Sequence, residues 1–205
     1  MTHCLYEELK GWQSGLAAIL GFVALIVGAL WNFHLNRKRD ANLRAEEMLS
    51  VAVALYGEII LLRNELADLA RAVANVHEDL GTRPNPVLKF DRHFVEAHAP
   101  SEPLLYRALA PKIGLLPAGL VLDITAFHKN LQETRVWLPR LIDDPDRAYS
   151  YNVTAVLVPA RDAVWDIIPA LRKIEQMAKI PERVAALDLG KTESAIALEE
   201  HMHEA

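Results

Sequence analysis

The stretch that decides the fold is WQSGLAAILGFVALIVGALWNFHL, Trp12 to Leu35. No Asp, Glu, Lys or Arg lies between Lys10 and Arg37, and residues 16–31 are apolar side chains and glycine alone. A helix needs about 20 such residues to cross the ~30 Å hydrocarbon core of a bilayer. The sequence therefore predicts a transmembrane helix over 12–35, preceded by a short lead-in over 1–11.

Two tryptophans bracket this apolar run. Trp12 and Trp31 would be separated by roughly 28 Å along a helix, which suits indole rings at the two membrane interfaces. One alternative is a helix buried in a soluble protein, which would need a large core around it. The other is a cleaved signal peptide, which has a basic N-terminal region and a small-x-small cleavage site. Acidic residues before the run and bulky residues at its end disfavour the signal peptide.

Basic residues follow the run directly. Arg37, Lys38 and Arg39 form the only tight basic cluster in the chain. The positive-inside rule therefore places the C-terminal side in the cytoplasm and the first residues outside. We expect these three side chains, with Trp12 and Trp31, to lie at the membrane interfaces.

One face of the predicted span consists of small residues at spacings of three and four: Ser14, Ala17, Gly21, Ala24 and Gly28. Small residues let helix backbones approach closely in lipid, so this face predicts a helix–helix interface within the membrane. The alternative is that Ala and Gly are simply common in membrane spans.

A second apolar pattern follows the basic cluster and alternates strictly between gaps of four and three. It begins at Ala41 and continues to Leu80 as an a/d seam of the kind found in coiled coils. Its central positions are Ala52, Leu55, Ile59, Leu62, Leu66, Leu69, Val73 and Val76. Additional apolar residues between 49 and 61 widen this face, so it requires several neighbouring helices from one chain or from several. Glu58 and Arg63 are expected to pair between helices, with Arg63 and Glu65 on the wet outer face.

The remaining chain contains two further helical stripes. A connection over 81–103 contains at most a turn of helix, and Ser101 is expected to cap a short helix after it. Long helices are predicted over 117–142 and 147–180. In the second, prolines 159 and 169 should kink or divide the helix.

We therefore predict an all-α fold. An N-terminal transmembrane helix runs into a long coiled-coil-like helix, which packs with two further long helices as a cytoplasmic bundle over 36–181. Residues 182–205 are expected to form a mobile or lightly docked acidic tail, with a possible terminal helix capped by Thr192.

Composition restricts the possible partners. The 205-residue chain has a net charge of −5, so nucleic acid is not an expected partner. Cys4 is the only cysteine, which excludes an intramolecular disulfide and suits a reducing compartment. The expected partners are the lipid bilayer and either a second copy of the chain or another membrane protein.

The sequence contains little that indicates catalysis. No phosphate-binding glycine loop or nucleophile elbow is present. His93 and His98 flank Glu96, but a spacing of five puts the histidines on different helix faces, so we expect no metal. We likewise expect no cofactor and no enzyme activity. The aromatic residues of the last helices belong in the core rather than in a ligand pocket: Phe127, Trp137, Tyr149, Tyr151 and Trp165.

The order of these parts resembles small single-pass bacterial inner-membrane proteins. The resemblance lies in the N-terminal WQ, the Gly/Ala/Leu-rich span, the basic stop and the stretch LYRALAPKIGLLPAGLVLDITAFH, Leu105 to His128. It implies a bacterial inner-membrane location with a cytoplasmic helical domain, and it implies no activity.

Two functions remain open at this point. The first is a structural or interaction protein that self-associates or joins a larger membrane complex. The second is a membrane-tethered sensor whose helical bundle binds a small ligand, which a roomy cavity with convergent polar groups would favour.

Overall fold

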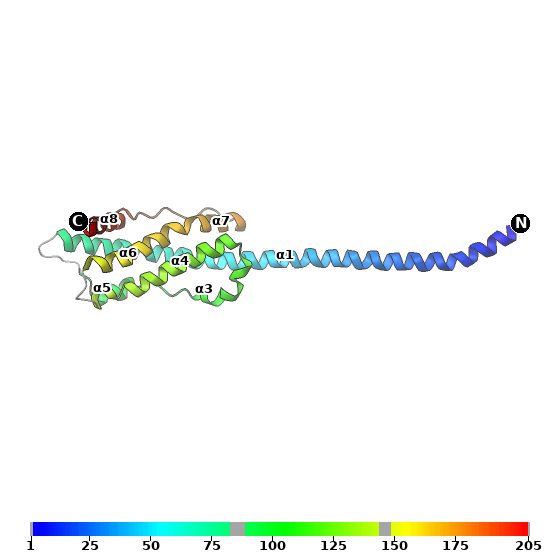
Figure 1. The fold of residues 1–205 in the computed structure, drawn as a ribbon, viewed down its shortest axis with the longest axis horizontal. Coiled ribbons are helices and arrows are strands. Elements are labelled where there is room, and N and C mark those ends of the chain that lie inside the picture. Colours follow the sequence, from blue (N-terminus) through cyan, green and yellow to red (C-terminus); the bar gives the residue numbers. More distant parts are fainter. Residues whose placement is uncertain (1, 83–88, 144–148, 205) are drawn as a thin grey trace. The chain divides into compact units, whose positions relative to one another are not determined.

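The chain is helical throughout the part that the structure describes. The computed structural model describes residues 2–82, 89–143 and 149–204 and contains no β-strand in these ranges. The elements in order are α1 (Thr2–Thr82), α2 (Arg92–His98), α3 (Leu104–Leu109), the 3₁₀ helix η1 (Ala110–Leu115), α4 (Ala118–Trp137), α5 (Arg140–Asp143), α6 (Tyr149–Asp166), α7 (Ile168–Ala178) and α8 (Gly190–Glu204) (Figure 1). The predicted all-helical class with a long N-terminal helix is confirmed.

The chain divides into two compact units, Met1–Glu47 and Met48–Ala205. The first unit is the N-terminal part of α1. It contains a stretch that is long and apolar enough to cross a membrane by length and composition. Leu25 is 73% exposed and Phe33 72%, and none of the apolar window is buried. This unit supplies no neighbour for its own apolar side chains.

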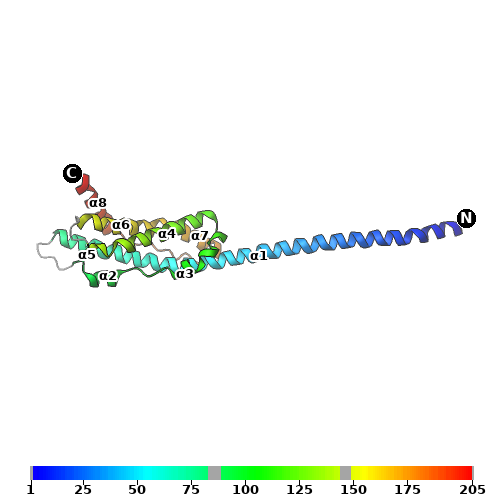
Figure 2. The same ribbon diagram turned by 60° about the horizontal axis from the view of Figure 1, so that its bottom comes forward.

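The second unit has one hydrophobic core. α4 contacts α6 and α7, and α6 also contacts α8 (Figures 1 and 2). The part of α1 from Val51 to Ala74 contributes a buried apolar stripe to the same core. The stripe on α4 lies at helical spacing, and its buried members are Leu120, Ile124, Phe127, Leu131 and Thr134. The hydroxyl of Thr134 donates to the carbonyl of Asn130 at 2.9 Å, which satisfies this buried polar group.

The predicted last long helix is divided in two. Pro159 lies inside α6, and Ile167 separates α6 from α7, with Pro169 in the first turn of α7. Lys179 ends α7 in the left-handed conformation, with φ 53°. Residues 181–189, which we call the strap, then connect α7 to α8 without helical structure.

The segment before α4 is held by carboxylates of α1. Glu58 accepts hydrogen bonds from the amides of Leu105 and Tyr106 at 2.6 and 2.8 Å, and so satisfies open amides at the start of α3. Glu65 accepts from the amide and the hydroxyl of Ser101 at 2.7 and 3.0 Å. Ser101 does not cap α3, whose N-cap is Pro103. The prediction that Ser101 caps this helix is wrong, because Glu58 of α1 accepts from the first amides of α3 instead.

The C-terminal segment is docked. The sequence predicts a mobile or lightly attached tail over 182–205, but Gly190–Glu204 forms α8, which contacts α6. Leu189 and Ile196 are 2% exposed and belong to the core. Thr192 lies inside α8 and is buried rather than capping it. The sequence did not predict this docking, because the apolar face of α8 consists of only a few residues in a segment of acidic composition.

Candidate functional site

The largest polar side chain in the core is Arg63 of α1, which is 1% exposed. Its Nε donates to the carbonyl of Val164 at 2.8 Å, and its Nη1 donates to the carbonyl of Ala185 at 3.1 Å. The sequence places Arg63 on a wet outer face or in a pair with Glu58, and both expectations are wrong. The heptad position of Arg63 could not predict that its side chain would donate to the backbone carbonyls of Val164 and Ala185.

The carbonyl of Val164 needs such a donor because of where α6 ends. The last carbonyls of a helix have no partner within the helix, and a cation there also interacts favourably with the helix dipole. Arg63 therefore links α1 to the end of α6 and to the strap. Its Nη2 has no hydrogen-bond partner in the described part of the chain.

A buried carboxylate holds the other side of the strap. Glu175 of α7 is 2% exposed and accepts from the hydroxyl of Tyr56 at 2.6 Å. The same oxygen accepts from the amides of Arg183 and Val184 at 2.7 and 3.2 Å. Two buried side chains of opposite charge thus hold adjacent parts of the strap. Arg63 donates to a strap carbonyl, and Glu175 accepts from two strap amides.

These contacts shift the ionisation of the buried groups. Burial opposes ionisation of Glu175, but the hydrogen bonds from Tyr56 and the strap amides dominate and lower its pKa. Burial, together with the bond to Glu175, raises the pKa of Tyr56 to about 12. The phenol therefore remains a donor and the carboxylate an acceptor at neutral pH.

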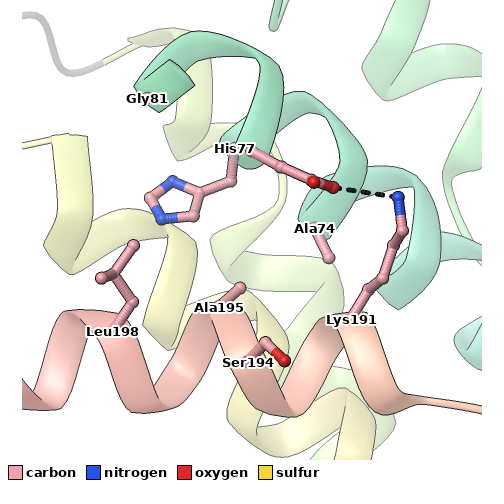
Figure 3. A pocket seen from close by; sticks show the side chains of 8 residues that line it. Ala74, His77, Gly81, Lys191, Ser194, Ala195 and Leu198 are labelled. Atoms are coloured by element: carbon pink, nitrogen blue, oxygen red, sulfur yellow. Dashed lines mark hydrogen bonds and ion pairs between the residues drawn. The ribbon is translucent and has the colours of Figure 1, made fainter.

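A pocket of about 410 Å³ lies between the end of α1 and α8 (Figure 3). Its apolar lining is Ala74, Ala195 and Leu198, and its polar lining is His77, Glu78, Lys191 and Ser194, with Gly81 beside the histidine. Figure 3 shows the His77 ring and the Leu198 side chain projecting into the space between the two helices. A volume of this size is within the range of small-molecule sites.

Two polar pairs involve residues of the pocket lining. Lys191 Nζ is 2.9 Å from an oxygen of Glu78 and donates to Asn75 at 3.0 Å, and these side chains are exposed. His77 Nε2 lies 3.0 Å from Oε1 of Glu199, whose side chain is 1% exposed. The other oxygen, Oε2, has no hydrogen-bond partner among the described residues. This pair could not be found from the sequence, because Glu199 lies in a segment of acidic composition that predicts an exposed tail.

A second histidine is buried away from the pocket. His128 of α4 is 7% exposed and stacks on Tyr106 of α3 with ring centroids 3.7 Å apart. Neither ring nitrogen has a hydrogen-bond partner within the described ranges. Burial lowers the pKa of His128 to about 4, so the imidazole is neutral at pH 7.

The residues predicted to lie in or at the membrane belong to the first unit. Trp12 is 74% exposed and Trp31 66%, and the basic cluster 37–39 is exposed as well. Of the small-residue face, Ala17, Gly21, Ala24 and Gly28 are exposed, and a Cβ at Gly21 or Gly28 would meet nothing within 4 Å. The Ser14 side chain lies outside the described residues. A helix–helix contact on this face stays a prediction.

The seam residues are buried within the second unit. The side chains of all eight predicted seam residues are at most 3% exposed, and all but Val76 belong to one core with residues of α4, α6, α7 and α8: Ala52, Leu55, Ile59, Leu62, Leu66, Leu69, Val73 and Val76. Ala41 and Ala45, at the start of the pattern, are exposed. The chain's own helices therefore cover the seam of α1, whereas Val53 and Leu61 of the widened face are 40% and 65% exposed.

His93, Glu96 and His98 lie on α2 (Arg92–His98), and Glu96 and His98 each contact other groups of this helix. Asp91 caps α2 by accepting from the amide of Phe94 at 2.8 Å. Glu96 pairs with Arg92 at 2.8 Å, and His98 lies 2.9 Å from the carbonyl of Phe94. No group of three or more potential metal ligands occurs among the described residues.

The aromatic residues named from the sequence do not line the pocket. Phe127 is buried in the core, Trp165 is 39% exposed, and Arg140 stacks over the ring of Trp137 at 4.4 Å. The side chains of Tyr149 and Tyr151 lie outside the described residues.

Comparison with protein-family models, with curated proteins and with solved structures finds no match to this chain.

Proposed function

We propose that this chain is a membrane-anchored structural and interaction protein. Its apolar N-terminal helix anchors it in a bacterial inner membrane, with a helical bundle in the cytoplasm, and it associates with a second copy or with another membrane protein. The observation that carries this proposal is the apolar stretch of α1, none of which is buried among the residues that the structure describes. The small-residue face at Gly21 and Gly28 is the surface for association in lipid.

The bundle offers an additional surface for a partner protein. Leu61 is 65% exposed, Leu104 67% and Leu105 45%. Leu61 shares a face of α1 with Glu58 and Glu65, because residues three and four apart lie together on a helix. Those two carboxylates hold residues 101–106, so the three leucines gather on one side of the bundle. Exposed apolar patches of this kind mark protein–protein interfaces.

Association through the membrane face is tested by Gly21→Ile in the full chain. The added side chain should separate the helices and reduce in-membrane crosslinking at least tenfold. Val23→Phe is the matched control, because it adds bulk on the far side of the helix. Equal crosslinking of Gly21→Ile, Val23→Phe and the natural chain would refute association through this face.

A ligand-binding sensor is the second candidate, and the pocket between α1 and α8 is the observation that favours it. Its polar groups come from α1 and α8, and Arg63 of α1 holds the strap that precedes α8. A ligand there would stabilise the contact of α8 with α1.

A further inference from the structure

We propose that the pocket between α1 and α8 binds a small uncharged molecule with an apolar body and one hydroxyl group, such as an alcohol or a phenol. This inference rests on the second candidate function, the ligand-binding sensor, and gives the class of its ligand. It is independent of the association proposed for the membrane helix. Three properties of the lining carry it: balanced charges, an apolar floor, and hydrogen-bonding capacity at one end.

The charges of the lining are balanced. Lys191 Nζ of α8 lies 2.9 Å from a carboxylate oxygen of Glu78 of α1. His77, the third titratable residue of the lining, has its Nε2 3.0 Å from the carboxylate of Glu199, so a proton on this ring would be balanced as well. An ion in the pocket would therefore lose water without gaining an uncompensated opposite charge. The lining favours an uncharged ligand over a cation or an anion.

The pocket is hollow because the apolar residues at its floor are small. Ala74 is 2% exposed and Ala195 is 7% exposed, so both lie at the bottom of the pocket rather than at its rim. A Cβ added at Gly81 would meet nothing within 4 Å. Leu198, which is 55% exposed, adds an apolar edge. A hydrocarbon body in this space would remove apolar surface from water on both sides, which is favourable.

Hydrogen-bonding capacity remains on two neighbouring residues of α8. Lys191 and Ser194 are three residues apart and therefore share a face of the helix. An ammonium has three N–H groups, and Lys191 donates to Asn75 and Glu78 at 3.0 and 2.9 Å, so one N–H remains. The Ser194 hydroxyl donates its hydrogen to the carbonyl of Gly190 at 2.9 Å, so its oxygen can only accept a further bond. One donor beside one acceptor matches a ligand hydroxyl, which accepts and donates at the same oxygen.

The two ends of the pocket differ in polarity. Figure 3 shows Lys191 and Leu198 at opposite ends of the α8 wall, with Ala195 between them. The ligand hydroxyl would lie toward Lys191 and Ser194, and the hydrocarbon body would lie over Ala195 toward Leu198. Because the other wall belongs to α1, the bound molecule would join the C-terminal helix to the rest of the bundle.

The experiment titrates cyclohexanol into the full chain in lipid nanodiscs and follows the methyl NMR signals of Ala74, Ala195 and Leu198. The methyl of Ala24, in the apolar stretch of α1, is the reference for alcohol that dissolves in lipid. We expect saturable shifts at the three pocket methyls, with a Kd lower by about tenfold or more than those of cyclohexylammonium and cyclohexanecarboxylate. Equal or tighter binding of either ion would overturn the ligand class but not the sensor. No saturable shift with any of the three compounds would overturn both.

Two charge variants test whether the balance of the lining sets this preference. Lys191→Met leaves Glu78 without the neighbouring ammonium, so the preference should move to cyclohexylammonium. Glu78→Gln leaves Lys191 without the neighbouring carboxylate, so the preference should move to cyclohexanecarboxylate. The double variant restores the balance and should again bind cyclohexanol more tightly than either ion. An unchanged preference for cyclohexanol in both single variants would contradict the proposal.

Substitutions of the exposed residue Ser194 locate the site. Ser194→Trp fills the pocket and should weaken cyclohexanol binding about tenfold or more, whereas Ala197→Trp, at an exposed position of α8 outside the lining, should not. Ser194→Ala removes the acceptor and should weaken binding about threefold. Unchanged binding by both Ser194 variants would contradict the assignment. Crosslinking through the Gly21 face is measured separately, so failure of this site is distinguishable from failure of the association.

Discussion

Two parts of α1 are rich in apolar residues and have opposite surroundings. In residues 17–35 the apolar side chains cover the whole circumference and are exposed. In residues 51–74 they form a stripe, and the residues of that stripe are buried by other helices of the chain. The comparison teaches that the pattern, rather than the amount, of apolar residues determines the neighbour. A stripe is satisfied by a few helices, whereas an all-round apolar helix requires lipid or an extensive partner.

The largest expected effect distinguishes two adjacent leucines in the buried part of α1. Leu62 is 2% exposed and Leu61 is 65% exposed. Leu62→Asp buries an unpaired charge and should lower the free energy of unfolding by about 4 kcal/mol or more. Leu61→Asp should change it by about 0.5 kcal/mol or less. Chemical denaturation of the full chain in micelles, followed by circular dichroism, measures both, and equal effects would contradict the burial of the seam.

A charge in the other part of α1 should act differently. Leu25→Arg places a cation near the middle of the apolar stretch, which costs about 2.5–3.5 kcal/mol for membrane insertion. We expect carbonate extraction to release this variant from membranes while the unfolding of the Met48–Ala205 unit is unchanged. Leu25→Ile is the control. Retention of Leu25→Arg in the membrane fraction would count against the span.

Arg63 is a charged residue within the buried region, and its replacement sharpens the comparison. Arg63→Met keeps much of the volume but leaves the carbonyls of Val164 and Ala185 without this donor. We expect a loss of about 2 kcal/mol in unfolding free energy. Arg71→Met, at a side chain that is 47% exposed, should lose about 0.5 kcal/mol or less. A stability equal to that of the natural chain would mean that these bonds contribute nothing net.

An effect of similar size is a pH response confined to the second unit. The pKa of His128 falls from 6.5 to about 4 on folding, so the unfolded chain binds the extra proton between these values. Stability is therefore complete above pH 6.5 and falls as the pH drops toward 4. The loss between pH 7 and pH 5 should be about 2 kcal/mol, and His128→Leu should remove it. The lowered pKa of Glu175 acts in the same direction, but below its unfolded pKa of about 4.5.

The sequence was sufficient for the parts of the fold that depend on periodicity. The apolar stretch, the seam and the stripe from Leu120 to Leu131 could be found by counting residues, because burial follows the helical repeat. The roles of Arg63 and Glu175 could not be found in this way, because both residues bond to backbone atoms. The carbonyl that Arg63 meets is 101 residues away in sequence, and the amide that Glu175 meets is 8 residues away. The pocket likewise depends on α8, whose short apolar face is hidden among acidic residues.

The long-range bonds of Tyr56 and Arg63 have a consequence for the order of synthesis. Tyr56 and Glu175 are 119 residues apart, and Arg63 and Ala185 are 122 apart. At about 5–20 residues per second, the ribosome needs roughly 6 to 24 s between making Arg63 and making its last acceptor. Arg63 therefore cannot form both of its native bonds until the chain has been made as far as Ala185, so this part of the core is completed only after the strap has been synthesised.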